Sequence, residues 1–160
     1  MSLKTADLSD AHEDAVAIAE PVFADFGGKL MFHGKIQTLK IFEDNTLVRK
    51  MVSQPGAGQV LVVDGGGSMR CALLGGNLST LAAQNGWSGI VIYGCIRDSE
   101  EIGAEPLGVK ALGTHPKKTP KNGVGEENLT VRFADVTFVP GQYIYGDEDG
   151  LLVSAESLHD

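Results

Sequence analysis

The sequence has little cysteine. Cys71 and Cys95 are the two cysteines among 160 residues, and their spacing matches neither a CxxC pair nor another metal-binding pattern. This excludes a disulfide-stabilised scaffold and a cysteine-ligated metal site. We expect both thiols to be reduced, small and buried, in a cytoplasmic protein.

Positive charge is scarce as well. The chain has 13 Lys and Arg against 21 Asp and Glu, so its formal net charge is −8. A general nucleic-acid binder needs a basic face that neutralises phosphates, so we expect no direct nucleic-acid binding. The acidic balance leaves room for contact with a basic protein surface.

Long hydrophobic runs, signal peptides, internal repeats and linkers are also missing. No apolar run reaches the roughly 18 residues that a membrane span requires, and the amino terminus shows no signal peptide. The length, with 42% apolar and 21% charged residues, predicts one globular domain over residues 1–160. The 21 glycines are interleaved with strand patterns, which indicates tight turns and close backbone approaches.

Strand and helix patterns alternate along the first two thirds of the chain, and the last third is all strand. The patterns predict one or two short helices over 5–19, helices over 46–52 and 78–85, a turn of helix over 99–105, and strands over 29–42, 60–63, 89–93, 107–112, 129–133, 136–139, 143–145 and 151–153. This order predicts an α/β fold with a mixed sheet and a barrel-like closure of the C-terminal strands.

A glycine-rich turn precedes the helix expected over 78–85. The run LGGNL places Gly75, Gly76, Asn77 and Leu78 at the start of this helix, downstream of the strand over 60–63 and its glycine-rich exit over 64–67. Glycines there let backbone N–H groups approach a ligand, and the helix dipole favours an anion. We therefore expect these four residues to bind a small carboxylate.

A cation and an anion follow the next buried strand. Arg97 and Asp98 stand just past its carboxyl end, where open α/β sheets bind their ligands. An arginine can hold a carboxylate through two parallel hydrogen bonds, and an aspartate can hold a hard divalent cation. The alternative is a surface turn with an adjacent charge pair. The glycine turn favours a pocket for a small carboxylate and a metal.

Two other charged segments have plainer interpretations. The run 115–123, HPKKTPKNG, is basic and punctuated by prolines, so we expect a solvated loop, with a lid or a partner contact as the alternative. Glu100, Glu101 and Glu105 are expected to form a solvated face rather than a metal site. His33 is expected to be a hydrogen-bonded structural residue.

The block VLVVDGGGSMRCALLGGNLSTLAAQNGWSGIVIYGCIRD, with FEDN near Phe42 and PGQYIYGDEDG near the end, resembles the RraA-like family. That family joins the regulator of ribonuclease E activity with metal-dependent 4-hydroxy-4-methyl-2-oxoglutarate aldolases. The resemblance covers essentially the full chain. It implies an α/β/α fold related to swivelling phosphohistidine domains, and a ring-shaped homotrimer with sites between neighbours.

The resemblance also assigns roles. In the aldolase members the position matching Arg97 binds substrate, the one matching Asp98 holds a divalent metal such as Mg²⁺ or Mn²⁺, and the backbone matching Gly75, Gly76, Asn77 and Leu78 cradles the pyruvoyl carboxylate. This implies a metal-assisted retro-aldol cleavage of a 2-keto acid that releases pyruvate, with oxaloacetate decarboxylation as a secondary activity.

The sequence is compatible with two functions. Aldolase-like relatives often carry an acid where this chain has Gly76, and that acid is thought to orient a metal-bound water; Asp64, Glu43 or a carboxylate of another subunit could replace it. The best known regulator, however, lacks an aspartate matching Asp98. An aldolase is therefore the first interpretation, and a protein that binds and inhibits ribonuclease E is the alternative.

Overall fold

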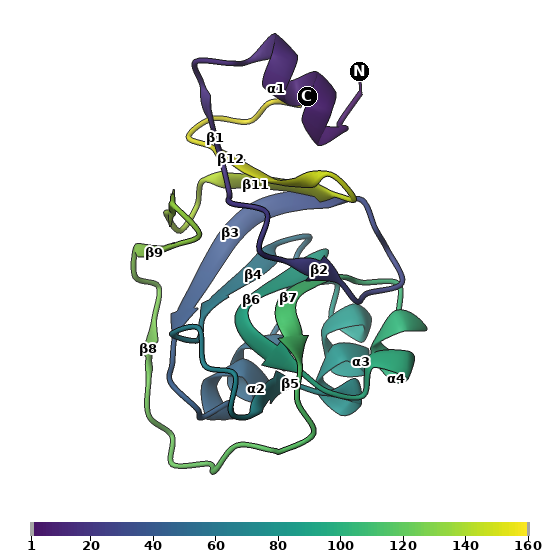
Figure 1. Ribbon diagram of the computed structural model, residues 1–160, viewed down its shortest axis with the longest axis vertical. Helices are drawn as coiled ribbons and strands as arrows, with labels where there is room; N and C mark the ends of the chain where they lie inside the picture. The colour runs from purple at the N-terminus through teal and green to yellow at the C-terminus, as the bar shows by residue number, and fades with distance from the viewer. Residues whose placement is uncertain (1, 160) are drawn as a thin grey trace.

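The computed structural model describes residues 2–159, and Figure 1 shows its arrangement. Within these residues the chain forms four helices, α1 (Thr5–Ala11), α2 (Thr46–Val52), α3 (Gly76–Gln84) and α4 (Ser99–Gly103). The strands of the same residues are β1 (Val16–Ile18), β2 (Ala24–Asp25), β3 (Phe32–Lys40), β4 (Val60–Asp64), β5 (Ala72–Leu74), β6 (Gly89–Ile96), β7 (Gly108–Thr114), β8 (Glu126–Glu127), β9 (Val131–Phe133), β10 (Val136–Phe138), β11 (Tyr143–Asp147) and β12 (Gly150–Ser154). No helix in the described part is long and apolar enough to cross a bilayer.

Four parallel strands form the centre of the large sheet, in the order β3-β4-β6-β7. Helices α2, α3 and α4 make the crossovers between them, as parallel pairing requires. The expected strand–helix–strand unit around the glycine turn is therefore present. Because the four strands are parallel, their carboxyl ends meet at one edge of the sheet.

Strict alternation of side chains gives this sheet two apolar faces. On β4, Leu61 and Val63 belong to the core shared with α2, α3 and α4, whereas Val60 and Val62 belong to a second core shared with β9 to β12. Figure 1 shows the three helices together at one end of the molecule, with α1 beyond β11 and β12 at the other. Helices thus lie on both sides of a mixed α/β sheet, as predicted.

The expected barrel-like closure of the C-terminal strands is wrong. Strand β11 pairs antiparallel with β3 and β12 pairs antiparallel with β11, so both extend the large sheet, while β9 and β10 pair only with each other. The large sheet is curved, because its opposite ends, β1 and β2, are joined by only residues 19–23. No closed barrel forms within residues 2–159.

The helical prediction for 5–19 is correct only in its first half. Helix α1 ends at Ala11, and Val16–Ile18 forms β1, which pairs with β12. Leu8 of α1 packs with Tyr145 and Leu152 behind the β11–β12 hairpin. A partner strand far along the chain thus decides the conformation of a short β-branched segment, which local periodicity does not reveal.

Candidate functional site

Loops from the carboxyl ends of the parallel strands surround a small cavity. Its volume is about 100 Å³, and its lining residues are Asn45, Arg49, Ala72, Gly75, Gly76, Asn77, Leu78, Arg97, Asp98, Lys118 and Lys121. Every site residue predicted from the sequence is in this set. At roughly 30 Å³ per water molecule, this volume has room for about three waters or for the carboxylate end of a small acid.

The start of α3 supplies backbone donors to the cavity. Gly76 N–H donates to Oδ2 of Asp98 at 2.9 Å, so one predicted donor is already used within the chain. The N–H groups of Asn77 and Leu78 belong to the first turn, where a helix offers no acceptor. These two groups remain for an anion, which the helix dipole also favours.

Arg97 ties two of the loops together. Its N–H donates to the carbonyl of Leu74 at 2.9 Å, and its guanidinium Nη1 donates to the carbonyl of Pro116 at 3.3 Å. Its other guanidinium donors have no hydrogen bond within the described residues. The guanidinium is therefore positioned by the fold and still able to bind a carboxylate.

Asp98 has a strained backbone. Its φ of 58° lies in the left-handed region, directly before α4 begins at Ser99. Such conformations of non-glycine residues persist where surrounding structure enforces them, and they cluster at functional sites. Only Oδ2 of the carboxylate has a hydrogen bond within residues 2–159, so Oδ1 is available for a ligand.

Glu101 is a neighbour of the cavity wall that sequence reasoning missed. A Cβ atom on Gly76 would collide with Oε2 of Glu101, so this carboxylate occupies the space that a side chain at position 76 would take. Glu101 is exposed to solvent, as expected. Its carboxylate nevertheless lies next to the start of α3. The spacing Asp98-x-x-Glu101 was the available signal, because residues three apart share one face of a helix.

Neither intramolecular candidate for the missing acid lies at the cavity. Glu43 accepts hydrogen bonds from Ser68 and from Arg70, the latter at 2.7 Å from Nε. Asp64 accepts from Gly66 N–H. None of Glu43, Asp64 and Glu101 lines the cavity, but Glu101 is the one whose carboxylate lies next to Gly76.

The basic run 115–123 forms one wall of the cavity. The carbonyl of Lys117 accepts from Ala72 N–H at 2.8 Å, and Thr119, only 3% exposed, bonds Asn45 through its hydroxyl. Lys118 and Lys121 line the cavity. The segment is solvated over most of its length, as expected, but Thr119 and the backbone of Lys117 dock it beside the cavity that Lys118 and Lys121 line.

Asp44 anchors this wall. Burial of its carboxyl opposes ionisation, but hydrogen bonds from Thr46, Asn122 and Val124 outweigh that effect and lower the pKa of Asp44 to about 2. The carboxylate therefore stays charged at neutral pH and joins α2 to the end of the basic segment.

The cysteines lie outside the cavity. Cys71 and Cys95 are both buried and free, as expected, and neither lines the site. Burial raises the pKa of both thiols, so they remain protonated at neutral pH.

The donor set around α3 suits a hard divalent cation. No group of three or more His, Cys, Asp or Glu side chains within residues 2–159 is placed to hold a metal. Asp98 and Glu101 supply two carboxylates, one with a free oxygen. Mg²⁺ is commonly held by one or two carboxylates, with waters and substrate completing its shell. The residues therefore fit such an ion, and they do not fit a zinc site made only of protein ligands.

Sequence comparison places the chain in a family. The sequence model of the RraA-like family, described as Aldolase/RraA, matches residues 5–153. The chain belongs to the RraA-like family. A relative from Laribacter hongkongensis, provisionally named 4-hydroxy-4-methyl-2-oxoglutarate aldolase, is 58% identical over 99% of both chains.

Solved structures of RraA-like proteins have the same fold. One is described as the RNA-processing inhibitor RraA from Thermus thermophilus; it has a TM-score of 0.95 and 46% identity, covering 99% of this chain and 96% of that one. Another, from Geobacillus kaustophilus, is described as an S-adenosylmethionine:2-dimethylmenaquinone methyltransferase; it has a TM-score of 0.95 and 48% identity, covering 97% and 96%. One RraA-like fold thus carries several functional names.

Proposed function

We propose that the chain is a divalent-metal-dependent aldolase that cleaves 4-hydroxy-4-methyl-2-oxoglutarate to pyruvate and also decarboxylates oxaloacetate. One observation carries this proposal: Arg97, the open start of α3 and the carboxylate of Asp98 line one small cavity, and the carboxylate of Glu101 lies next to Gly76 in its wall. The provisional name of the 58% identical relative supports the substrate.

Substrate binding in this proposal uses positive charge and backbone donors. The guanidinium of Arg97 binds the carboxylate beside the keto group, together with the N–H groups of Asn77 and Leu78. Gly75 and Gly76 let the ligand approach the backbone closely. Lys118 and Lys121 add positive potential that attracts a doubly charged acid.

Cleavage breaks the bond between C3 and C4 of the substrate. The C4 hydroxyl loses its proton and becomes the keto group of one pyruvate, and C3 accepts a proton to become the methyl group of the other. In this proposal the carboxylate of Glu101, which lies next to Gly76, takes the hydroxyl proton. Asp98 would hold the divalent cation through its free oxygen, and that cation supplies polarisation of the keto oxygen.

The test is pyruvate release from each substrate with Mg²⁺ or Mn²⁺. We expect turnover that EDTA abolishes and that added metal restores. Asp98→Ala should abolish activity, whereas Glu100→Ala, which removes an exposed carboxylate from the same helix, should retain it. Turnover that persists in EDTA, or no turnover of either substrate, would remove the aldolase proposal.

A second candidate is regulation of ribonuclease E. The inhibitor from Thermus thermophilus is 46% identical, and a homotrimer of subunits with charge −8 would attract a basic protein segment. We expect native mass spectrometry to give a trimer, and binding to ribonuclease E to weaken with salt. Absence of salt-sensitive binding would exclude this function and leave the aldolase proposal intact.

A further inference from the structure

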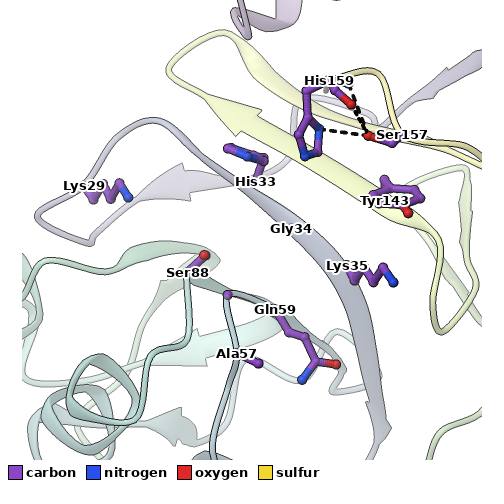
Figure 2. Close-up of a pocket in the computed structure, with 11 residues that line it drawn as sticks. Lys29, His33, Gly34, Lys35, Ala57, Gln59, Ser88, Tyr143, Ser157 and His159 are labelled. Carbon is purple, nitrogen blue, oxygen red and sulfur yellow. Dashed lines mark hydrogen bonds between the residues drawn. The ribbon is translucent and has the colours of Figure 1, made fainter.

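A second cavity lies at the opposite edge of the parallel strands, where they begin. It has a volume of about 660 Å³, and the side chains facing it include Lys29, His33, Lys35, Gln59, Tyr143 and His159 (Figure 2). They come from the segment before β3 and from β3 itself, the loop before β4, β11 and the C-terminal segment. The volume is within the usual range for small-molecule sites.

The lining is positive, although the chain as a whole carries a net negative charge. No Asp or Glu of residues 2–159 lines the cavity. Within those residues, the ammonium groups of Lys29 and Lys35 form neither an ion pair nor a hydrogen bond, whereas Lys50 and Lys110 are paired with carboxylates. Lys29 and Lys35 thus bring two unpaired ammonium groups to one cavity of a chain with net charge −8.

Two histidines stand together in the same cavity. The ring centroids of His33 and His159 are 4.6 Å apart, and Figure 2 shows the His159 ring directed at His33. Burial, His159 and Lys29 together lower the pKa of His33. A further positive charge is therefore unfavourable at this position, and an anion in the cavity would relieve the repulsion.

Hydrogen bonds orient the proton of His159. The Tyr145 hydroxyl accepts from Leu158 N–H at 2.8 Å and lies 2.7 Å from Nδ1 of His159. The Ser157 hydroxyl donates to the His159 carbonyl. The arrangement that satisfies all of these groups has Tyr145 donating to Nδ1, so neutral His159 carries its proton on Nε2. That N–H is a directed donor in addition to the two ammonium groups.

We propose that this cavity binds a small anion with at least two negative charges, a phosphorylated or polycarboxylate molecule, through Lys29, Lys35, His33 and His159. The lysine ammonium groups supply positive charge, and the histidine imidazoles supply N–H hydrogen-bond donors. The site is separate from the Arg97 cavity, because the two lie at opposite ends of the parallel strands. It does not depend on the proposed aldolase activity.

The test observes the imidazole resonances of the full chain by NMR while inorganic pyrophosphate or citrate is added. Both anions are multiply charged, and the two arms distinguish a phosphate from a carboxylate site. We expect saturable shifts at His33 and His159 with at least one anion. Of the four histidines, His12 and His115 lie outside the cavity and serve as internal references.

Matched double variants test the assignment. Lys29→Ala/Lys35→Ala should weaken binding at least about fivefold. Lys40→Ala/Lys50→Ala removes the same charge from exposed positions outside the cavity and should leave affinity unchanged, as should Arg97→Ala. No saturable shift below about 10 mM anion, or equal weakening in the two double variants, would overturn the proposal.

Discussion

Asp98 combines a proposed metal ligand with an unfavourable backbone conformation. Both Asp98→Gly and Asp98→Ala remove the carboxylate, but only glycine tolerates φ of 58° without cost. We expect both variants to lose pyruvate release, and Asp98→Gly to be more stable than Asp98→Ala by about 1 kcal/mol. Urea unfolding of the two variants measures the difference. Equal stabilities would mean that the left-handed backbone is not maintained in solution.

Glu101 provides a second prediction at this scale. In the proposed reaction Glu101→Gln removes the proton acceptor, and we expect kcat to fall at least about tenfold with little change in KM. Gly76→Ala should also lower kcat, because its Cβ displaces the Glu101 carboxylate; the fold tolerates this, since a flexible side chain can move away. The neighbouring Glu100→Gln is the control. Unchanged kcat in both site variants would assign Glu101 to the surface.

The sequence predicts some site residues better than others. Gly75 to Leu78, Arg97 and Asp98 could be placed together because parallel strands bring their carboxyl ends to one edge. Glu101 could not be placed with them, because only the folded structure shows that its carboxylate occupies the space beside Gly76. The hydrogen bond from Gly76 N–H to the Asp98 carboxylate could not be predicted from the sequence either.

At the scale of elements, Asp44 fastens the basic wall to α2. Its pKa is lowered from the usual 3.8 to about 2, so its stabilising effect is complete above pH 3.8 and disappears as pH falls toward 2. We expect Asp44→Asn to cost about 2 kcal/mol at pH 7 and less below pH 3. Denaturant titrations at both pH values measure this.

Hydrogen exchange gives a local readout of the same variant. The N–H groups of Asn122 and Val124 donate to Asp44, so they should exchange faster in Asp44→Asn. Asp135→Asn removes an exposed carboxylate elsewhere and should change neither exchange nor stability at pH 7 appreciably. A stability loss in Asp44→Asn that is the same at both pH values would contradict the role given to its charge.

Elements were predictable where their partners are close in sequence. The strands around β4 and β6 are continuous apolar runs with a helix between them, so local pattern and final structure agree. The segment of β1 has an ambiguous local pattern, and its conformation comes from the pairing of Val16 with Ser154, nearly the whole chain away. The barrel expectation was wrong for a similar reason: β11 pairs with β3 rather than only with its C-terminal neighbours.

At the scale of the whole molecule, a buried lysine joins distant parts of the curved sheet. The Lys110 side chain is 3% exposed; its ammonium lies 2.9 Å from Oδ1 of Asp25 on β2 and donates to the carbonyl of Asp147 on β11 at 2.7 Å. Because β2 and β11 are far apart in strand order, this group adds a second link across the curved sheet, besides the short connection 19–23. No sequence pattern marks a lysine on a buried strand as such a link.

Removing Lys110 should therefore weaken the entire fold. We expect Lys110→Ala to cost about 3 kcal/mol, because it leaves the Asp25 carboxylate without its partner and opens a cavity, while Lys110→Met should cost less. A double-mutant cycle with Asp25→Ala should give a coupling above about 1 kcal/mol. The exposed pair of Lys50 and Glu127, treated in the same way, should give less than about 1 kcal/mol. Additive losses at Lys110 and Asp25 would mean that the curvature is held by apolar packing alone.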